Sequence, residues 1–197
     1  MEQAFTLMRQ WNGPSPVSRI ESVMDVQKTR MTTDEIQFRP KDGDYLYSAA
    51  ALAALAGDPY KSHRALCNRA AREQVITSEP YRASDQADCA LLYRRWSEQK
   101  CQDHQDRLGQ LLLEDAEPAH QLVFREHDRI GVSGRVMRVN NKIVAYTFGY
   151  WLTPATWCVL LEVADRSVPG LAQWVFRETC RMASAQGAVW INAMDDS

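Results

Sequence analysis

The chain has 197 residues, of which 45% are hydrophobic, enough for one domain of ordinary size and a shorter extension. Its formal net charge of −2 gives no overall attraction to nucleic acid or to an anionic membrane, so such binding would need a local basic patch. The longest run of small apolar residues, 49–56, is too short to span a bilayer, and the first residues lack the basic start of a secretory signal. We therefore expect a cytoplasmic protein whose five cysteines are reduced.

Residues 1–47 carry the weakest pattern of the chain. Turn-forming residues such as those at 13–16 are typical of a linker. We predict that residues 1–47 are an N-terminal extension and that residues 48–197 form the folded domain. At the start of this domain Ser48 is a suitable N-cap for an Ala/Leu helix that stops at Gly57.

After Gly57 the hydrophobic pattern changes between the helical period and the strand period. It predicts a basic helix, a strand and two further helices, at 60–73, 76–82, 84–100 and 110–127. Three strands follow at 134–139, 142–152 and 157–164, then a helix at 171–186 and a last strand at 188–192. Asn140 and Asn141 tolerate the positive φ angles of a tight hairpin between the first two of these strands. This order predicts an α+β fold with a mainly antiparallel sheet and helices on both faces.

A glycine-containing loop, 165–170, opens the helix at 171–186. Unpaired backbone N–H groups at a helix start attract phosphate. The candidate ligands for the phosphates of a bound donor are Arg166, Ser167, Gly170 and Ala172. An ordinary Pro-Gly turn into a helix explains the same pattern equally well.

Several short motifs recur in one known family in the same order. They are Tyr45-Leu-Tyr47, Arg64 with Asn68, Val144 to Gly149, Glu162, Pro169-Gly170, and Asn192 with Asp195 and Asp196. On these residues the chain resembles the bacterial family related to the C-terminal domain of phosphatidylglycerol lysyltransferases. The resemblance implies a GNAT-like (acyl-CoA N-acyltransferase-like) fold, often built as two lobes in tandem. It also implies acyl or aminoacyl transfer as the reaction class.

The chain departs from the family pattern at several places, among them Ala65, where asparagine is usual, and most of the first lobe, which is absent. His63 and Val163 stand where lysines are usual, and the segment that follows Asp196 in similar proteins is absent. We therefore expect a GNAT-like domain that is truncated, with its C-terminal strands missing.

Glu162 is the first candidate catalytic residue, because it interrupts an otherwise apolar strand. Strand alternation places it on the face of Cys158, Leu160 and Ala164. A partly desolvated carboxylate has a raised pKa, which suits a general base. A carboxylate paired with an arginine, or one at the margin of the sheet, would explain the residue without catalysis.

Two functions remain open and predict different structures. An acyl- or aminoacyltransferase, which takes its group from aminoacyl-tRNA or acyl-CoA, should have a tunnel between strands 142–152 and 157–164. Glu162 and Tyr146 should line this tunnel as catalytic residues. A non-catalytic domain that binds a partner protein or nucleic acid should instead fill the space with side chains such as Phe148, Trp151 and Trp157.

The candidate substrate ligands lie in two places. Arg64 and Asn68 share one face of the basic helix and could hold a tRNA end, although a solvated helix face explains them as well. Asn192 and Asp195 follow the last strand, where α/β sites often collect, and a solvated terminus is the alternative. The four histidines lack metal-ligand spacing, so we expect no metal.

The last predicted strand, 188–192, bears on the oligomeric state. Val189, Trp190 and Ile191 make it apolar, and without the strands that would flank it one edge should be open. We predict a homodimer that pairs this edge. The alternative is that residues 1–47 fold back and cover it.

Overall fold

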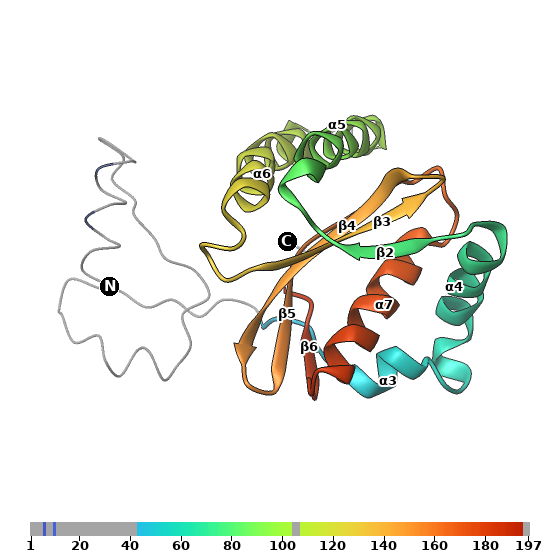
Figure 1. Ribbon diagram of the computed structural model, residues 1–197. Helices are drawn as coiled ribbons and strands as arrows, with labels where there is room; N and C mark the ends of the chain where they lie inside the picture. The colour runs from blue at the N-terminus through green and yellow to red at the C-terminus, as the bar shows by residue number, and fades with distance from the viewer. Residues whose placement is uncertain (1–5, 7–9, 11–42, 104–106, 195–197) are drawn as a thin grey trace. The chain divides into compact units, whose positions relative to one another are not determined.

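The computed structural model describes residues 6, 10, 43–103 and 107–194 (Figure 1). The chain divides into two units, 1–41 and 42–197, and every element discussed here belongs to the second. The elements are β1 (Leu46–Ser48), α3 (Ala49–Ala54), η1 (Asp58–Tyr60), α4 (Lys61–Glu73), β2 (Thr77–Pro80), η2 (Ala83–Asp85), α5 (Gln86–Asp103), α6 (Arg107–Glu126), β3 (Ser133–Val139), β4 (Lys142–Thr153), β5 (Thr156–Ala164), α7 (Leu171–Ala185) and β6 (Trp190–Asn192).

The sheet has six strands in the order β1-β6-β5-β4-β3-β2. All neighbours are antiparallel except β5 and β6, which are parallel. Figure 1 shows α5 and α6 on one face of the sheet, and α3 and α7 on the other with α4 packed against α7. The predicted α+β, GNAT-like fold class is confirmed. No helix in the described ranges is long and apolar enough to cross a bilayer.

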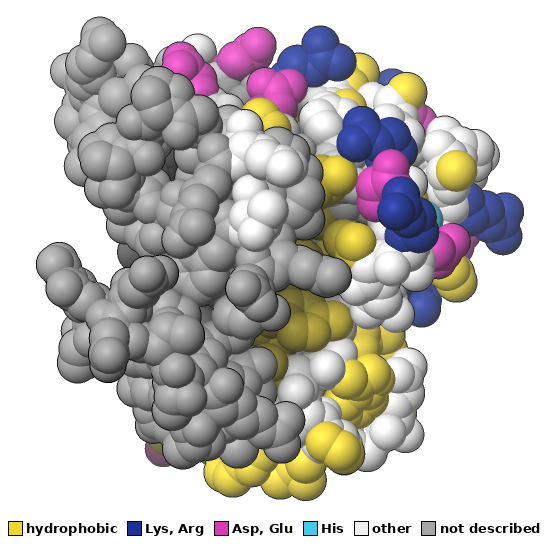
Figure 2. All heavy atoms as spheres, turned by 90° about the vertical axis from the view of Figure 1, so that its left-hand side faces the viewer, with side chains coloured by type: hydrophobic (Ala, Val, Ile, Leu, Met, Phe, Trp, Pro, Cys, Tyr) yellow, Lys and Arg dark blue, Asp and Glu magenta, His cyan; other side chains and the backbone are white. Residues whose placement is uncertain are grey.

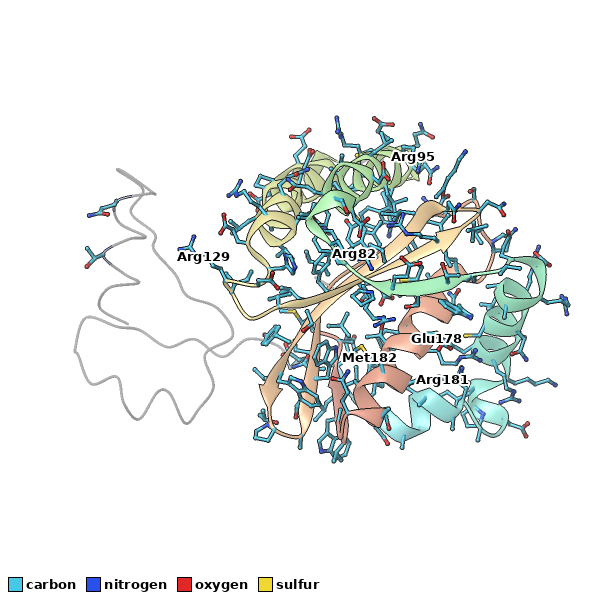
Figure 3. All side chains as sticks on the ribbon, in the orientation of Figure 1. Arg82, Arg95, Arg129, Glu178, Arg181 and Met182 are labelled. Carbon is cyan, nitrogen blue, oxygen red and sulfur yellow. The ribbon has the colours of Figure 1, made fainter. Side chains whose placement is uncertain are left out.

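Local signals in the sequence position the element ends as predicted. The Ser48 hydroxyl accepts a hydrogen bond from the Ala51 N–H at 3.4 Å and so caps α3. Asn140 and Asn141 have φ angles of 50° and 63°, which close the β3–β4 hairpin. Further along, Figure 3 shows Glu178 and Arg181 on α7, where they form an ion pair at 2.7 Å.

The last strand, β6, is covered by the start of the described chain. Leu46 to Ser48 pair antiparallel with Trp190 to Asn192. The prediction of an open edge on the last strand is therefore wrong. A second copy of the chain cannot pair with β6 at that edge, so the physical reason for the predicted dimer is removed. The structure shows the alternative, because a segment from 1–47 provides the neighbouring strand and the predicted boundary after residue 47 falls inside β1.

Large apolar side chains are exposed on and next to β1, which is now the edge strand of the sheet. They are Tyr45, Leu46, Tyr47, Val189 and Trp190. Figure 2 shows the hydrophobic side chains that gather on one face of the molecule.

The predicted tunnel between β4 and β5 is absent from the described residues. These two strands pair from Ala145 opposite Ala164 to Thr153 opposite Thr156. On the other side of β5 the neighbouring strand is short: β6 pairs with β5 over Thr156 to Cys158 and ends at Asn192. Beyond Cys158, β5 has no strand neighbour on its β6 side in the part of the chain that the structure describes.

A β-bulge in the β4–β5 pair changes which residues of β5 share a face with Glu162. Phe148 lies opposite Leu161 but Gly149 lies opposite Val159, so Leu160 is an extra residue. Ala164 packs in a cluster with α7, as predicted for the face of Glu162, whereas Leu160 packs on the α5–α6 side. Cys158 also lies on that other side, opposite Tyr150. The prediction that Glu162 shares a face with Cys158 and Leu160 is therefore wrong.

Candidate functional site

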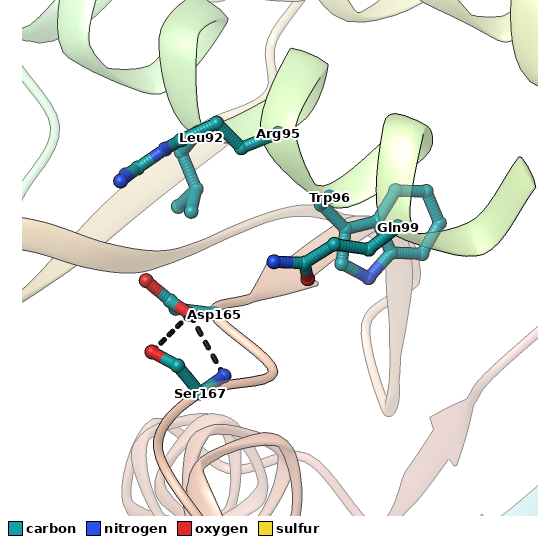
Figure 4. A pocket seen from close by; sticks show the side chains of 6 residues that line it. All are labelled: Leu92, Arg95, Trp96, Gln99, Asp165 and Ser167. Atoms are coloured by element: carbon teal, nitrogen blue, oxygen red, sulfur yellow. Dashed lines mark hydrogen bonds between the residues drawn. The ribbon is translucent and has the colours of Figure 1, made fainter. Parts of the chain in front are cut away.

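A small hollow lies where β5 ends, between α5 and the loop that leads into α7 (Figure 4). It has a volume of about 110 Å³ and is lined by Leu92, Arg95, Trp96, Gln99, Asp165 and Ser167. We call it the α5 hollow. Its four helical residues recur at the spacing of one helix face. Figure 4 shows Gln99 and Asp165 facing each other across it.

Sequence reasoning missed the α5 side of this hollow. Arg95, Trp96 and Gln99 look like ordinary positions of an amphipathic helix, and nothing local links them to a loop about seventy residues later. Arg95 is exposed and has no ion-pair partner among the described residues, so it can meet a bound anion. The only signal that could have found them is their common helix face.

The predicted phosphate loop is occupied by its own carboxylate. The Asp165 carboxylate accepts hydrogen bonds from the Ser167 N–H at 2.9 Å and from the Ser167 hydroxyl at 2.7 Å. Two donors that a phosphate would use are thus engaged, and a negative charge borders the hollow. Arg166 and Ala172 are exposed next to this turn. Their role as phosphate ligands stays a prediction.

Gly170 has a structural reason to be glycine. It precedes α7 with a φ of 78°, and a Cβ atom placed there would lie 2.2 Å from the Leu66 carbonyl oxygen. The close approach of α4 to α7 therefore requires glycine, with or without a bound phosphate.

Glu162 lies on β5 opposite Thr147 of β4, on the face covered by α7. Its Oε2 atom is buried and has no hydrogen-bond partner among the described residues. Burial raises the pKa of Glu162 to about 8, and the Thr147 hydroxyl opposes part of this rise. Glu162 can therefore accept a proton close to neutral pH.

The raised pKa of Glu162 predicts a pH-dependent stability. Between its ordinary pKa of 4.5 and the folded value of about 8, the folded protein holds a proton that the unfolded chain has lost. Stability should then fall as the pH rises through this window. Glu162→Gln should raise the free energy of unfolding by about 3 kcal/mol at pH 8 and change it little at pH 4. Urea denaturation at both pH values tests this, and equal stabilisation at both would contradict it.

Tyr146 lies on the opposite face of the sheet from Glu162. It is fully buried against α6, and its hydroxyl is 2.8 Å from His120 Nδ1. Burial raises the pKa of Tyr146 and lowers the pKa of His120 to about 4, so both groups are neutral near pH 7. The two predicted catalytic residues therefore do not line one cavity, and a catalytic role for Tyr146 stays a prediction without support from this geometry.

Arg64 is engaged in holding the chain after α3. Its guanidinium donates to the Leu55 carbonyl and, at 3.0 Å, to the Gly57 carbonyl. Leu55 ends α3 in the left-handed region with a φ of 48°, so these bonds satisfy carbonyls at a helix end. Asn68 is exposed one turn further along α4. Substrate binding by either residue stays a prediction.

Asn192 joins β6 to the segment that leads into β1. Its Nδ2 donates to the Asp44 carboxylate at 2.8 Å, and its Oδ1 accepts from the Met194 N–H at 2.7 Å. These bonds fully explain a buried amide at this position, and its role in substrate binding stays a prediction. Asp195 lies outside the described residues. Within the described ranges, no group of three or more His, Cys, Asp or Glu side chains could hold a metal ion.

Comparison with known proteins identifies one family and several solved structures with a similar fold. The family model described as "Phosphatidylglycerol lysyltransferase, C-terminal" matches residues 3–196. No curated protein matches the sequence significantly.

Two solved structures resemble the fold. A conserved protein of unknown function from Bacteroides thetaiotaomicron has 27% identity and a TM-score of 0.67, covering 78% of this chain and 50% of its own. The structure of L-PGS from Bacillus licheniformis has 14% identity and a TM-score of 0.52, covering 77% of this chain and 44% of its own. The chain thus spans about half the length of these two solved structures.

Proposed function

We propose an acyl- or aminoacyltransferase function from the premise that this chain belongs to the phosphatidylglycerol lysyltransferase C-terminal family. The proposed reaction moves the group from an activated ester or thioester to an amine or a hydroxyl. The observation that carries the proposal is that β5 continues beyond Cys158 whereas β6 ends at Asn192, which leaves that side of β5 without a strand neighbour among the described residues. An unpaired strand edge offers backbone N–H and C=O groups to an extended donor.

The residues around this edge suit the steps of acyl transfer. The acceptor's oxygen or nitrogen attacks the donor carbonyl, and its proton passes to Glu162. The C–O or C–S bond to the leaving group then breaks, and the leaving group takes up a proton. In this proposal Glu162 acts as the general base, and Arg95 in the α5 hollow meets the phosphates of the donor.

We expect the donor to be an aminoacyl ester such as aminoacyl-tRNA rather than a CoA thioester. Asp165 occupies the Ser167 donors and places a negative charge where pyrophosphate would lie. A tRNA donor implies a cytoplasmic site of action.

Isothermal titration with acetyl-CoA should accordingly show weak binding or none. Asp165→Asn should tighten any binding about fivefold, which corresponds to removing about 1 kcal/mol of charge repulsion. Asp88→Asn, an exposed residue in the first turn of α5, is the matched control and should have no effect. A dissociation constant of a few micromolar for the unchanged protein, about −7 to −8 kcal/mol, would instead favour CoA as donor.

The activity itself can be tested with substrates suggested by the family description. Radiolabelled lysyl-tRNA is incubated with the protein and vesicles containing phosphatidylglycerol, and the label is followed into the lipid fraction. Transfer above the rate without protein would support the proposal. Failure with this pair and with other aminoacyl-tRNAs and amine acceptors would favour the second candidate.

The second candidate is a non-catalytic domain that binds a partner. The specific observation in its favour is that both predicted catalytic features are closed in the described structure. Asp165 fills the phosphate turn, and one oxygen of Glu162 is enclosed beneath α7. A domain of this kind should bind tRNA or protein without any turnover.

A further inference from the structure

Six buried side-chain polar atoms have no hydrogen-bond partner among the described residues. Three of them lie together on the sheet face beneath α7: Thr147 Oγ1, Trp157 Nε1 and Glu162 Oε2. Buried polar groups in native proteins are nearly always paired with protein or with ordered water. Three unpaired groups at one place therefore indicate a shared partner.

The register of β4 and β5 brings these three groups together. Thr147 lies directly opposite Glu162. Trp157 Nε1 lies 2.6 Å from where a Cβ atom of Gly149 would be, and Gly149 is the next residue after Thr147 on the same face. Because Gly149 has no side chain, the indole N–H lies over Gly149, on the same face as the Thr147–Glu162 pair and two residues along β4 from Thr147.

Helix α7 closes this space from above. Cys180 of α7 is fully buried, and its thiol pKa is raised to about 12 by burial and then by the charge of Glu162. Thr147 and Trp157 are 4% and 3% exposed, so the groups that they present are shielded from bulk solvent. Glu162 itself is only half-buried, so this place is not completely closed to solvent.

We propose that Thr147, Trp157 and Glu162 form a binding site for a single hydroxyl group. The chemistry of the three groups is complementary to such an oxygen. The indole N–H donates to it, the carboxyl group accepts its proton or donates one, and the threonine hydroxyl can do either. Two to four partners are what a buried water requires. In the resting protein the site holds water, and during transfer it takes the hydroxyl of an alcohol acceptor.

The proposal that the site takes an acceptor's hydroxyl during transfer rests on the proposed function. The proposal that it holds water at rest does not. If Glu162 is the base, the bound oxygen is placed to hand its proton to Oε2. Thr147 and Trp157 then act as positioning residues, because they orient the oxygen and the carboxyl group without bonding to the donor. The bound water also solvates the ionised carboxylate of Glu162. Removing the groups of Thr147 and Trp157 that hold this water should therefore raise the pKa of Glu162.

The test uses two substitutions that remove a polar atom and keep the shape. Thr147→Val removes the hydroxyl, and Trp157→Phe removes the indole N–H. Thr179→Val is the matched control for the first, because the Thr179 hydroxyl is buried but already donates to the Val175 carbonyl at 3.0 Å. Trp151→Phe is the control for the second, because Trp151 packs edge-on against Trp157 and is 39% exposed.

The first readout is the titration of the Glu162 carboxyl carbon by NMR in protein labelled at glutamate. Each of the two substitutions should raise the pKa of Glu162 by about one unit, a tenfold change in proton affinity. The two controls should leave it unchanged. The Thr147 hydroxyl itself lowers the pKa of Glu162, so the rise in Trp157→Phe is the decisive result. A merely structural role of Trp157 would alter stability but would not move this pKa.

The second readout is the water itself. A long-lived water should show a nuclear Overhauser contact with the Trp157 indole proton, and Thr147→Val should weaken it. Absence of this contact in the unchanged protein, together with an unaltered Glu162 pKa in Trp157→Phe, would overturn the proposal. Neither readout needs turnover, so a failed transfer assay would count against the proposed function alone.

Kinetic measurements on the same variants show whether the hydroxyl bound during transfer belongs to water or to an alcohol acceptor. If the acceptor's hydroxyl enters the site, both variants should raise KM for the acceptor at least fivefold and leave donor binding unchanged. If water occupies the site throughout, kcat should fall and KM should stay constant, which would overturn the acceptor half of the proposal. Unchanged kcat and KM would overturn it as well.

Discussion

Glu162→Gln should lower the rate of acyl or aminoacyl transfer by about a hundredfold or more. Glutamine keeps the size of the side chain but cannot accept the acceptor's proton. Glu162 is suited to that role because burial raises its pKa to about 8, whereas an ordinary carboxylate would be a poor base at neutral pH. The rate is measured with lysyl-tRNA and phosphatidylglycerol vesicles under single-turnover conditions.

The control for this prediction is Glu178→Gln. Glu178 is a partly exposed acid on α7 that pairs with Arg181. Its substitution should change the rate less than twofold. A Glu162→Gln protein with unchanged turnover and an intact circular dichroism spectrum would remove Glu162 from the mechanism.

Gly170→Ala should destabilise the fold by about 3 kcal/mol or more. The added methyl group would lie 2.2 Å from the Leu66 carbonyl oxygen, so α4 and α7 must separate. The backbone there also has a φ of 78°, which disfavours any residue with a Cβ atom. Urea denaturation followed by tryptophan fluorescence measures the loss.

Gly187→Ala separates the two causes of this loss. Gly187 also has a positive φ, 101°, but a Cβ atom there would meet nothing within 4 Å. Its substitution should cost about 1 kcal/mol, from backbone conformation alone. Equal losses for the two variants would show that the contact with Leu66 contributes nothing.

Much of the secondary structure follows from interactions between residues that are close in the sequence. The Ser48 cap, the Asn140-Asn141 turn and the two hydrophobic periods act within a few residues, so the sequence predicts these elements and their order correctly. The α+β class follows from that order, since an antiparallel sheet with apolar stripes on its helices must be covered on both faces, whereas the GNAT-like fold is what the family resemblance implies. Glu162 is recognisable for the same reason, as one acid in an apolar strand.

The candidate site depends instead on contacts between distant parts of the chain. The pairing of β1 with β6 joins the two ends of the described domain, and no local pattern encodes it. One extra residue at Leu160 reverses the side-chain alternation of β5, which puts Cys158 and Leu160 on the opposite face from Glu162. The α5 hollow and the Thr147–Trp157–Glu162 group likewise form only when helices and strands pack together. Strand register and helix packing depend on the apolar surface that the whole domain buries, through contacts between residues far apart in the sequence. A pattern that extends over a few residues carries no information about those contacts.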